Sequence, residues 1–300
     1  MPSPLHPRNR FRVPYDFDAL PGMSPFVRPS PSGRPTIDFA DPEAVRALNR
    51  SLLEHAYAIS GWNFPTSHLT PAVPGRLDLL HHVADLLAGD NGGRLPNTVD
   101  ALDVGTGASA IYALLGAAEW GWHFLASDTD PASLEAAAAI LRANPALPIA
   151  LRQQPDPASC FHGVLGPGEV LDLTVCNPPF YASAATAAAA SARKASRLGT
   201  PADRSNFSGQ ANELHCPGGE HAFLHRMAKE STAWAQRVRW FTSLVAASDH
   251  VPGLQGALQK LGATRVEVLP MATGNKQSRV LAWTFLTPEQ ERQWRRYRWA

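Results

Sequence analysis

The chain from residue 98 onward alternates short apolar runs with stretches of helical periodicity. Seven runs have the length and residue types of strands: 98–104, 123–127, 149–153, 171–176, 239–245, 265–269 and 280–285. Four stretches repeat apolar residues at helical spacing: 109–119, 131–143, 219–235 and 251–261. Strands that alternate with helices predict a mostly parallel sheet covered on both faces. We therefore expect a doubly wound α/β fold with seven strands.

The N-terminal third has a different pattern. Residues 1–35 are rich in Pro, Ser and Arg and show no clear period, which predicts an extended arm. Asp41 precedes Pro42 and an apolar stripe that includes Leu48, so a helix with Asp41 as its N-cap is expected. A second helix is expected over residues 75–87. The sequence thus predicts a helical extension before the α/β core.

Three segments follow from these patterns. Residues 1–95 form a basic arm and helical segment, residues 96–288 form the core, and residues 289–300 form a tail of interleaved Arg and aromatic residues. Such a tail suits stacking on RNA bases, and it suits a frayed amphipathic end equally well.

Composition narrows the class of protein. In 300 residues, 44% hydrophobic and 18% charged, no run of 18 uncharged apolar residues occurs, so we expect no transmembrane helix. The segment Met1–Pro4 lacks the apolar core of a signal peptide. Three cysteines are too few and too scattered for a disulfide framework or a zinc site. We expect a cytoplasmic protein without a metal.

The net charge of +1 hides an uneven distribution. Five arginines precede Pro35, against Asp16 and Asp18, and further basic clusters lie between Phe180 and Glu213 and in the last residues. Basic segments around a neutral body fit a polyanionic partner, and they fit a solvated surface equally well.

A glycine turn follows the first core strand. Gly105 and Gly107 permit positive φ and close approach of a ligand, at the strand end where doubly wound sheets bind ligands. Asp103 suits the cationic methionine end of S-adenosylmethionine, directly or through water, and Ser109 is expected near the ligand at the helix start. The turn lacks the third glycine of the dinucleotide fingerprint.

An acidic residue at the end of the second core strand is placed to accept hydrogen bonds from ribose hydroxyls. Asp128 is the first candidate. Asp130 is the second, although Asp130-Pro131 also fits a helix cap. Together with the glycine turn, Asp128 favours S-adenosylmethionine over a nicotinamide cofactor.

The tetrapeptide Asn177-Pro178-Pro179-Phe180 follows the fourth core strand. An exocyclic amine of adenine is a poor nucleophile, because its lone pair is delocalised into the ring. The Asn177 side-chain oxygen and the Pro178 carbonyl are suited to accept its two N–H bonds, and Phe180 is suited to stack on the base. Catalysis would then rest on orientation and preorganised dipoles. The amide of a protein glutamine is also a planar nitrogen, so this motif alone leaves both substrates open.

With these motifs the chain resembles the bacterial 23S ribosomal RNA adenine-N6 methyltransferases, which are related to the eukaryotic U6 small nuclear RNA adenine-N6 methyltransferase. The matching segments are 6–10, 38–49, 74–76, the glycine turn, 177–180 and 276–279. The resemblance implies a Rossmann-like class I methyltransferase core with seven strands, preceded by a helical RNA-binding segment. Thr106 and Ser109 look closer to the eukaryotic relative.

The resemblance also implies roles for single residues. Arg76 would approach the cofactor carboxylate, joined by Gly105, Ser109, Asp128 and Asn177, and Gln153 and Gln154 would lie near the cofactor adenine. The RNA contacts implied are Arg8, Arg10 and Arg12 in the arm, with Lys276 and Arg279 before the last strand. The implied partner is 23S ribosomal RNA, free or in an assembling particle, and a monomer is expected.

Other conspicuous residues are interpreted as packing: His81, His82, Trp120, Trp122 and Cys176. Residues 181–192, almost all Ala, Ser and Thr, are interpreted as a flexible lid. Three further hypotheses remain beside the leading one. They are a protein glutamine methyltransferase, a methyltransferase of a structured small RNA, and an RNA-binding protein with a vestigial cofactor pocket.

Overall fold

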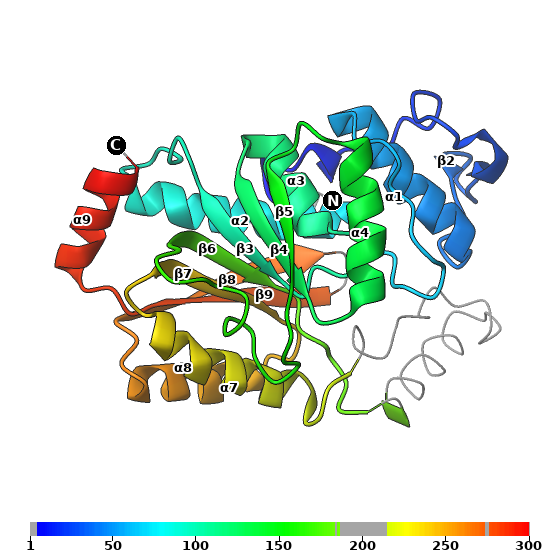
Figure 1. The fold of residues 1–300 in the computed structure, drawn as a ribbon. Helices are drawn as coiled ribbons and strands as arrows, with labels where there is room; N and C mark the ends of the chain where they lie inside the picture. Colours follow the sequence, from blue (N-terminus) through cyan, green and yellow to red (C-terminus); the bar gives the residue numbers. More distant parts are fainter. Residues whose placement is uncertain (1–4, 184, 187–214, 274–275, 300) are drawn as a thin grey trace.

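Seven strands form one sheet at the centre of the computed structural model, which describes residues 5–183, 185–186, 215–273 and 276–299 (Figure 1). The strands are β3 (Asp100–Val104), β4 (His123–Asp128), β5 (Ile149–Gln153), β6 (Leu171–Cys176), β7 (Val238–Val245), β8 (Arg265–Thr273) and β9 (Lys276–Thr284). They lie in the order β5-β4-β3-β6-β7-β9-β8. β3 to β7 run parallel, and β9 runs antiparallel to β7 and β8.

The last two strands are longer than predicted. The β8–β9 ladder continues to the pair Thr273–Lys276, well beyond the apolar runs 265–269 and 280–285. Pro270 and the polar residues after it interrupt the hydrophobic pattern, but the two strands still satisfy each other's backbone groups. The segment Lys276–Arg279 therefore lies within β9 and not before it.

Helices cover both faces of the sheet, as the alternating pattern predicts (Figure 1). On one face lie α2 (Val73–Asp90), α3 (Ile111–Trp120) and α4 (Pro131–Ala143), and on the other lie α7 (Gly219–Ser231) and α8 (His250–Lys260). Each face has its own buried apolar cluster. Neighbouring strand residues alternate between the clusters, with Trp240 in the first and Phe241 in the second.

The helix α1 (Pro42–Tyr57) begins as predicted. The Asp41 side chain accepts a hydrogen bond from the Glu43 amide at 2.9 Å, and Pro42 occupies the first helical position. Buried residues of α1 and α2 belong to the same apolar cluster as β3, α3 and α4. The N-terminal extension and the core therefore share one hydrophobic interior.

The expectation of an extended arm is wrong. Residues 5–41 fold through two short 3₁₀ helices, η1 (Arg10–Arg12) and η2 (Ser24–Phe26), and a small hairpin of β1 (Arg28–Pro29) and β2 (Pro35–Thr36). Four apolar side chains of this segment are buried: Phe17, Leu20, Met23 and Ile37. All four belong to the same apolar cluster as α1 and α2, so the arm packs on the helical extension although no α-helix forms in it.

The start of the arm is tied to α2 through one buried carboxylate. Asp78 Oδ1 accepts hydrogen bonds from the His6 amide at 2.6 Å and from Asn9 Nδ2 at 3.1 Å. Asn9 Nδ2 also donates to the Pro74 carbonyl, and Asn9 Oδ1 accepts from the Phe11 amide. The His6–Arg10 segment thus contains a structural anchor.

The C-terminal segment is an ordered helix, so the interpretation as a frayed end is wrong. In α9 (Pro288–Arg298), Thr287 and Gln290 form a capping box. Trp294 and Trp299 are buried, and both indole groups donate to Asp172 Oδ1, at 2.8 and 2.7 Å. Because Asp172 lies near the start of β6, α9 covers the amino ends of the strands. These two tryptophans are accordingly placed for packing and not for stacking on RNA.

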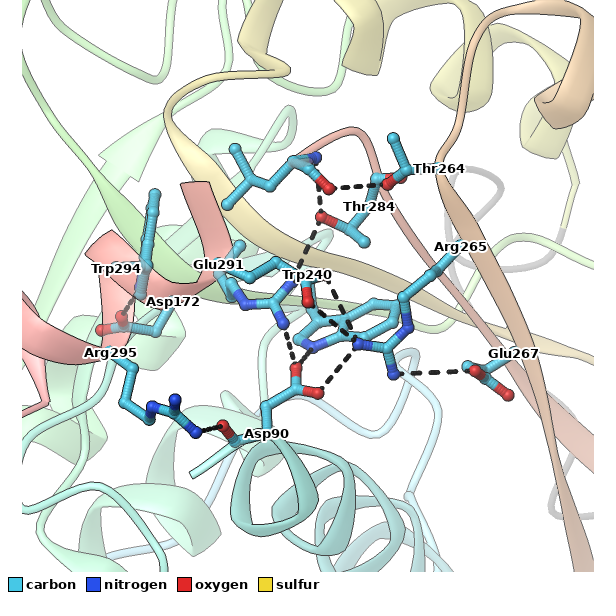
Figure 2. A network of polar contacts seen from close by, with 12 residues as sticks. Asp90, Asp172, Trp240, Thr264, Arg265, Glu267, Thr284, Glu291, Trp294 and Arg295 are labelled. Carbon is cyan, nitrogen blue, oxygen red and sulfur yellow. Dashed lines mark hydrogen bonds and ion pairs between the residues drawn. The ribbon is translucent and has the colours of Figure 1, made fainter. Parts of the chain in front are cut away.

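A polar network fastens α9 to α2 and the sheet (Figure 2). Arg239 on β7 is 1% exposed and forms ion pairs with Asp90, at the end of α2, and with Glu291 of α9. Trp240 Nε1 and Arg265 Nη1 also donate to Asp90, at 2.6 and 2.9 Å. One acidic residue thus joins the end of α2 to β7 and β8.

Candidate active site

The strand order of the sheet reverses between β3 and β6. These two strands are adjacent and parallel, and Val104 pairs with Cys176 at their carboxyl ends. The next residues along each chain segment are Gly105 and Asn177. Ligands of doubly wound sheets bind at such a switch point, so the glycine turn and the tetrapeptide meet where the fold favours a site.

A cavity of about 590 Å³ lies at this edge. Its walls come from the N-terminal extension, the ends of β3, β4 and β6, the loop after β5, and the start of α7. Among the predicted site residues it is lined by Arg76, Gly105, Gly107, Ser109, Asp128, Gln154 and Asn177. The structure therefore brings together seven of the nine residues expected near a cofactor. Gln153, which is exposed, and Asp103 do not line the cavity.

The glycine turn is shaped for close approach of a ligand. Gly105 has φ +73° and Gly107 has φ +62°, and the amides of Gly105 and Thr106 donate to the Ser127 carbonyl at the end of β4. A Cβ at Gly105 would meet no other atom within 4 Å, although the residue lines the cavity. Space beside the backbone is what a bound nucleoside or amino-acid group needs.

Two carboxylates follow β4, and the structure separates their roles. Asp128 lines the cavity, and its two oxygens accept from the Gly107 amide at 2.8 Å and the Asp130 amide at 2.9 Å. Asp130 instead caps α4, accepting from the amides of Ala132 and Ser133. Asp128 is thus oriented toward the cavity, and Asp130 is occupied by its helix.

Asp103 is one of the two predicted cofactor residues that do not line the cavity. It is 1% exposed, and its side chain accepts from Thr106 Oγ1 at 2.7 Å, behind the glycine turn. Burial raises the pKa of Asp103 to about 7, helped by the nearby Asp128 and opposed by the Thr106 hydrogen bond and by Arg76. A direct contact with a ligand is not supported, and the residue supports the turn instead.

Replacement of Asp103 by Asn is expected to change how stability depends on pH. The pKa is near 3.8 in the unfolded chain and about 7 in the folded protein, so the folded state retains a proton that the unfolded state loses. The protonated Asp103 therefore contributes its full share to the stability of the folded state below about pH 4. That share is lost as the pH rises to about 7. Urea unfolding of wild type and Asp103→Asn at pH 5 and pH 8 measures it. An equal difference between the two proteins at both pH values would contradict this assignment.

The tetrapeptide presents an acceptor to the cavity. Asn177 and Pro179 line it, and among the described residues Asn177 Oδ1 is a buried oxygen without a hydrogen-bond partner. Buried polar atoms are rarely left unpaired, so this oxygen is available to accept a hydrogen bond from an N–H group of a molecule in the cavity. Pro178 is buried, and Phe180 is half-buried against the larger apolar cluster and does not line the cavity.

Two further predicted residues, Arg76 and Gln154, line the cavity. Arg76, near the start of α2, has its guanidinium 5.6 Å from the centre of the Tyr112 ring, and both residues line the cavity. Gln154 also lines it, but its amide is engaged, since Nε2 donates to the His162 carbonyl and Oε1 accepts from the Asp156 amide. Gln154 therefore shapes the loop that forms this wall.

Sequence reasoning missed Glu230, which holds the same loop from α7. Its carboxylate accepts three consecutive backbone amides, those of Cys160, Phe161 and His162, at 2.7, 2.9 and 2.7 Å. Cys160 lines the cavity, so Glu230 fixes part of the cavity wall although it does not itself line the cavity. No sequence pattern marks a glutamate that pairs with amides about 70 positions away.

The predicted RNA contacts lie in two places. In the arm, Arg8 pairs with Asp85, Arg10 pairs with Glu119 at 2.7 Å, and Arg12 donates to the Pro7 carbonyl; all three are exposed. Arg279 pairs in register with Val245 at the carboxyl end of β7, which places it and Lys276 at the cavity edge of the sheet. The arginines and lysine between residues 187 and 214, and most of the expected lid, lie outside the described residues.

The packing interpretations are supported for the other candidates. Burial raises the pKa of the Cys176 thiol well above its ordinary value, and burial lowers the pKa of His81 to about 4. Trp120 and Trp122 stack at 4.7 Å between ring centres. No cluster of three or more potential metal ligands occurs among the described residues. Within the same residues, no helix has the length and apolar character needed to cross a membrane.

The sheet order, the glycine turn and the carboxylate on the next strand define an α/β enzyme that binds a nucleoside-containing cofactor at its switch point. A family profile described as RNA methyltransferase matches residues 1–287. The chain belongs to this RNA methyltransferase family, as the resemblance in its motifs predicts. The match ends where α9 begins.

Relatives and solved structures agree with this assignment. The chain is 50% identical to the ribosomal RNA large subunit methyltransferase F of Cronobacter sakazakii, covering 97% of this chain and 96% of that one. It is 50% identical to the protein of the same name from Pseudomonas paraeruginosa, covering 99% of this chain and 93% of that one. The catalytic domain of hMettl16, solved with the MAT2A 3′UTR hairpin 1, matches with a TM-score of 0.80 and 31% identity. The match covers 95% of this chain and 96% of that one. The N-terminal domain of human METTL16 with bound SAH matches with a TM-score of 0.75 and 28% identity over 94% and 99%. The fold class expected from the sequence is confirmed.

Proposed function

We propose that the protein transfers a methyl group from S-adenosylmethionine to the exocyclic N6 of an adenine in 23S ribosomal RNA. The observation that carries this proposal is the buried Asn177 Oδ1, an acceptor without a partner among the described residues, in a cavity beside the glycine turn. Two relatives at 50% identity are named for methylation of large-subunit ribosomal RNA, which supports the substrate.

The residues present fit S-adenosylmethionine. The space beside Gly105 admits a ligand against the backbone, Asp128 is oriented to accept ribose hydroxyls, and Arg76 offers a cation to a carboxylate. The SAH bound to the related human METTL16 domain supports the same choice. When bound, the cofactor supplies an electrophilic methyl group on a sulfonium.

The chain's own part in the reaction is to orient and polarise the amine. Asn177 Oδ1 accepts a hydrogen bond from one N–H group of the adenine amine. This favours a pyramidal nitrogen with a lone pair directed outward. The Pro178 carbonyl is proposed to accept a hydrogen bond from the second N–H group, since a proline has no backbone N–H but keeps its carbonyl oxygen. No side chain has to act as a strong base, because the methylated amine is acidic and loses its extra proton to water.

The RNA is proposed to approach from the N-terminal extension. Arg8, Arg10 and Arg12 are exposed on the folded arm, and Arg279 and Lys276 lie in β9 beside and beyond the carboxyl end of β7. Contacts to phosphates would compete with the ion pairs of Arg8 and Arg10 and would weaken as salt rises. We place the reaction in the cytoplasm, where ribosomal RNA is made, and we propose a monomer as the acting form.

Methyl transfer to unmodified 23S RNA, followed by nucleoside analysis, tests the proposal. We expect N6-methyladenosine to appear at one position. If calorimetry shows that the cofactor binds and no N6-methyladenosine forms on free RNA or on assembling large subunits, the proposal is wrong. A radiolabel in protein would instead favour a glutamine methyltransferase, and a label in structured small RNAs would favour that substrate.

A further inference from the structure

An aromatic side chain stands exposed on the wall of the same cavity. Phe39 is 61% exposed, although most large apolar side chains of the described residues are buried. It lines the cavity from the N-terminal extension, on a different segment from Asn177 and the glycine turn. An exposed ring at the edge of a binding cavity indicates a surface that a ligand covers.

The backbone holds Phe39 in place. Asp38 Oδ1 accepts from the Ala40 amide at 3.0 Å, and the Asp38 carbonyl accepts from the Asp41 amide at 3.1 Å. Ile37, two residues before the ring, is 2% exposed, and Asp41, two residues after it, caps α1. Asp38 is further paired with Arg28 at 3.1 Å. The ring therefore projects from a fixed turn, which lowers the entropy that a contact would cost.

We propose that Phe39 stacks on an unpaired base of the substrate RNA where that base enters the cavity. This rests on the proposed function. A base that leaves a helix to reach an active site loses its stacking, and an aromatic side chain restores it. The Phe180 ring is half-buried against the core and does not line the cavity. Phe223 lines the cavity from α7 and is half-buried, so Phe39 is the exposed phenylalanine on the cavity wall.

Other residues that line the same cavity as Phe39 have side chains suited to an RNA base. Val45 and Leu69 line the cavity with it and extend an apolar wall, while Arg76 and Arg226 supply cations in the same cavity. A flat apolar ring that carries polar edges matches such a wall. Stacking of this kind contributes about 1–3 kcal/mol per base, which corresponds to about a 5- to 150-fold effect on binding.

Substitutions at Phe39 separate stacking from simple burial. Phe39→Ala is expected to lower kcat/KM for the RNA by about 5- to 150-fold, with cofactor affinity changed less than about twofold. Phe39→Trp should retain the wild-type kcat/KM for the RNA. Phe39→Leu should show most of the decrease in kcat/KM that Phe39→Ala shows. Val268→Ala is the matched control, because Val268 is also an exposed apolar residue, at 36%, but does not line the cavity. Wild-type kinetics for Phe39→Ala, or full activity for Phe39→Leu, would overturn the inference.

A second measurement does not depend on methyl transfer. A set of 23S RNA fragments, each carrying 2-aminopurine at one unpaired adenine position, is titrated with wild type and with Phe39→Ala. A fluorescence change at one position that needs Phe39 supports stacking and identifies the base, and identical signals from both proteins at every position contradict it. If wild type forms no N6-methyladenosine, the proposed function fails on that assay, while the fluorescence still decides the role of Phe39.

Discussion

Asn177→Ala is expected to lower the rate of methyl transfer by about a hundred- to a thousandfold, the range seen when one preorganised hydrogen-bonding group is removed from an active site. The substitution removes the oxygen that would accept from the amine. Without it the nitrogen lone pair stays conjugated with the ring, and the amine is no longer aligned with the methyl group. Single-turnover rates with saturating RNA and cofactor measure the effect on the chemical step.

The cofactor should still bind to this variant. Gly105, Asp128 and Arg76 are untouched, so calorimetry should give a dissociation constant close to that of wild type. Asn177→Asp is the matched control, because it keeps an acceptor at the same position and should retain more activity than Asn177→Ala. A rate for Asn177→Ala within threefold of wild type would remove the central argument for this site.

Asp90→Ala is expected to destabilise the protein by about 3–5 kcal/mol, because it leaves the Arg239 guanidinium buried with less compensation. Arg239 is 1% exposed, and burial already lowers its pKa despite Asp90 and Glu291. The substitution also removes the acceptor of Trp240 Nε1 and of Arg265 (Figure 2). The midpoint of urea unfolding followed by circular dichroism measures the loss.

Glu289→Ala provides the comparison for Asp90→Ala. Glu289 also pairs with an arginine, Arg292 of the same helix, but both side chains are exposed. Ion pairs in water contribute little, so this variant should unfold close to wild type. Equal midpoints for Asp90→Ala and Glu289→Ala would mean that the buried network does not stabilise the fold.

The sheet could be predicted because its information is local. The five parallel strands are short apolar runs between turn residues, and β5 and β6 have the predicted bounds, whereas β8 and β9 extend beyond their apolar runs. The arm and the C-terminal segment could not be predicted in this way. Their positions depend on contacts between distant residues, such as His6 with Asp78 and Trp294 with Asp172, and such contacts leave no periodic trace.

The site was predictable to the extent that it sits at strand ends. Gly105 follows β3, Asp128 is the last residue of β4, and Asn177 follows β6. Fold topology alone therefore brings them to one edge of the sheet. The direction of a side chain is a separate matter. Asp103 lies two residues before Gly105 but is buried behind the turn, and Glu230 acts on amides that only the folded chain brings near.

One hydrogen bond bears on how this enzyme could have been assembled in evolution. The Trp62 indole, in the N-terminal extension, donates to the carbonyl of Ser109 in the cofactor turn at 3.0 Å, and the ring is 1% exposed. The extension therefore buttresses the cofactor turn and is not an independent module attached to it. A chimaera that joined residues 1–95 to another methyltransferase core would need to supply both a partner for this indole and a recess for its ring. We therefore expect N-terminal extensions to be exchangeable only between cores that share this turn.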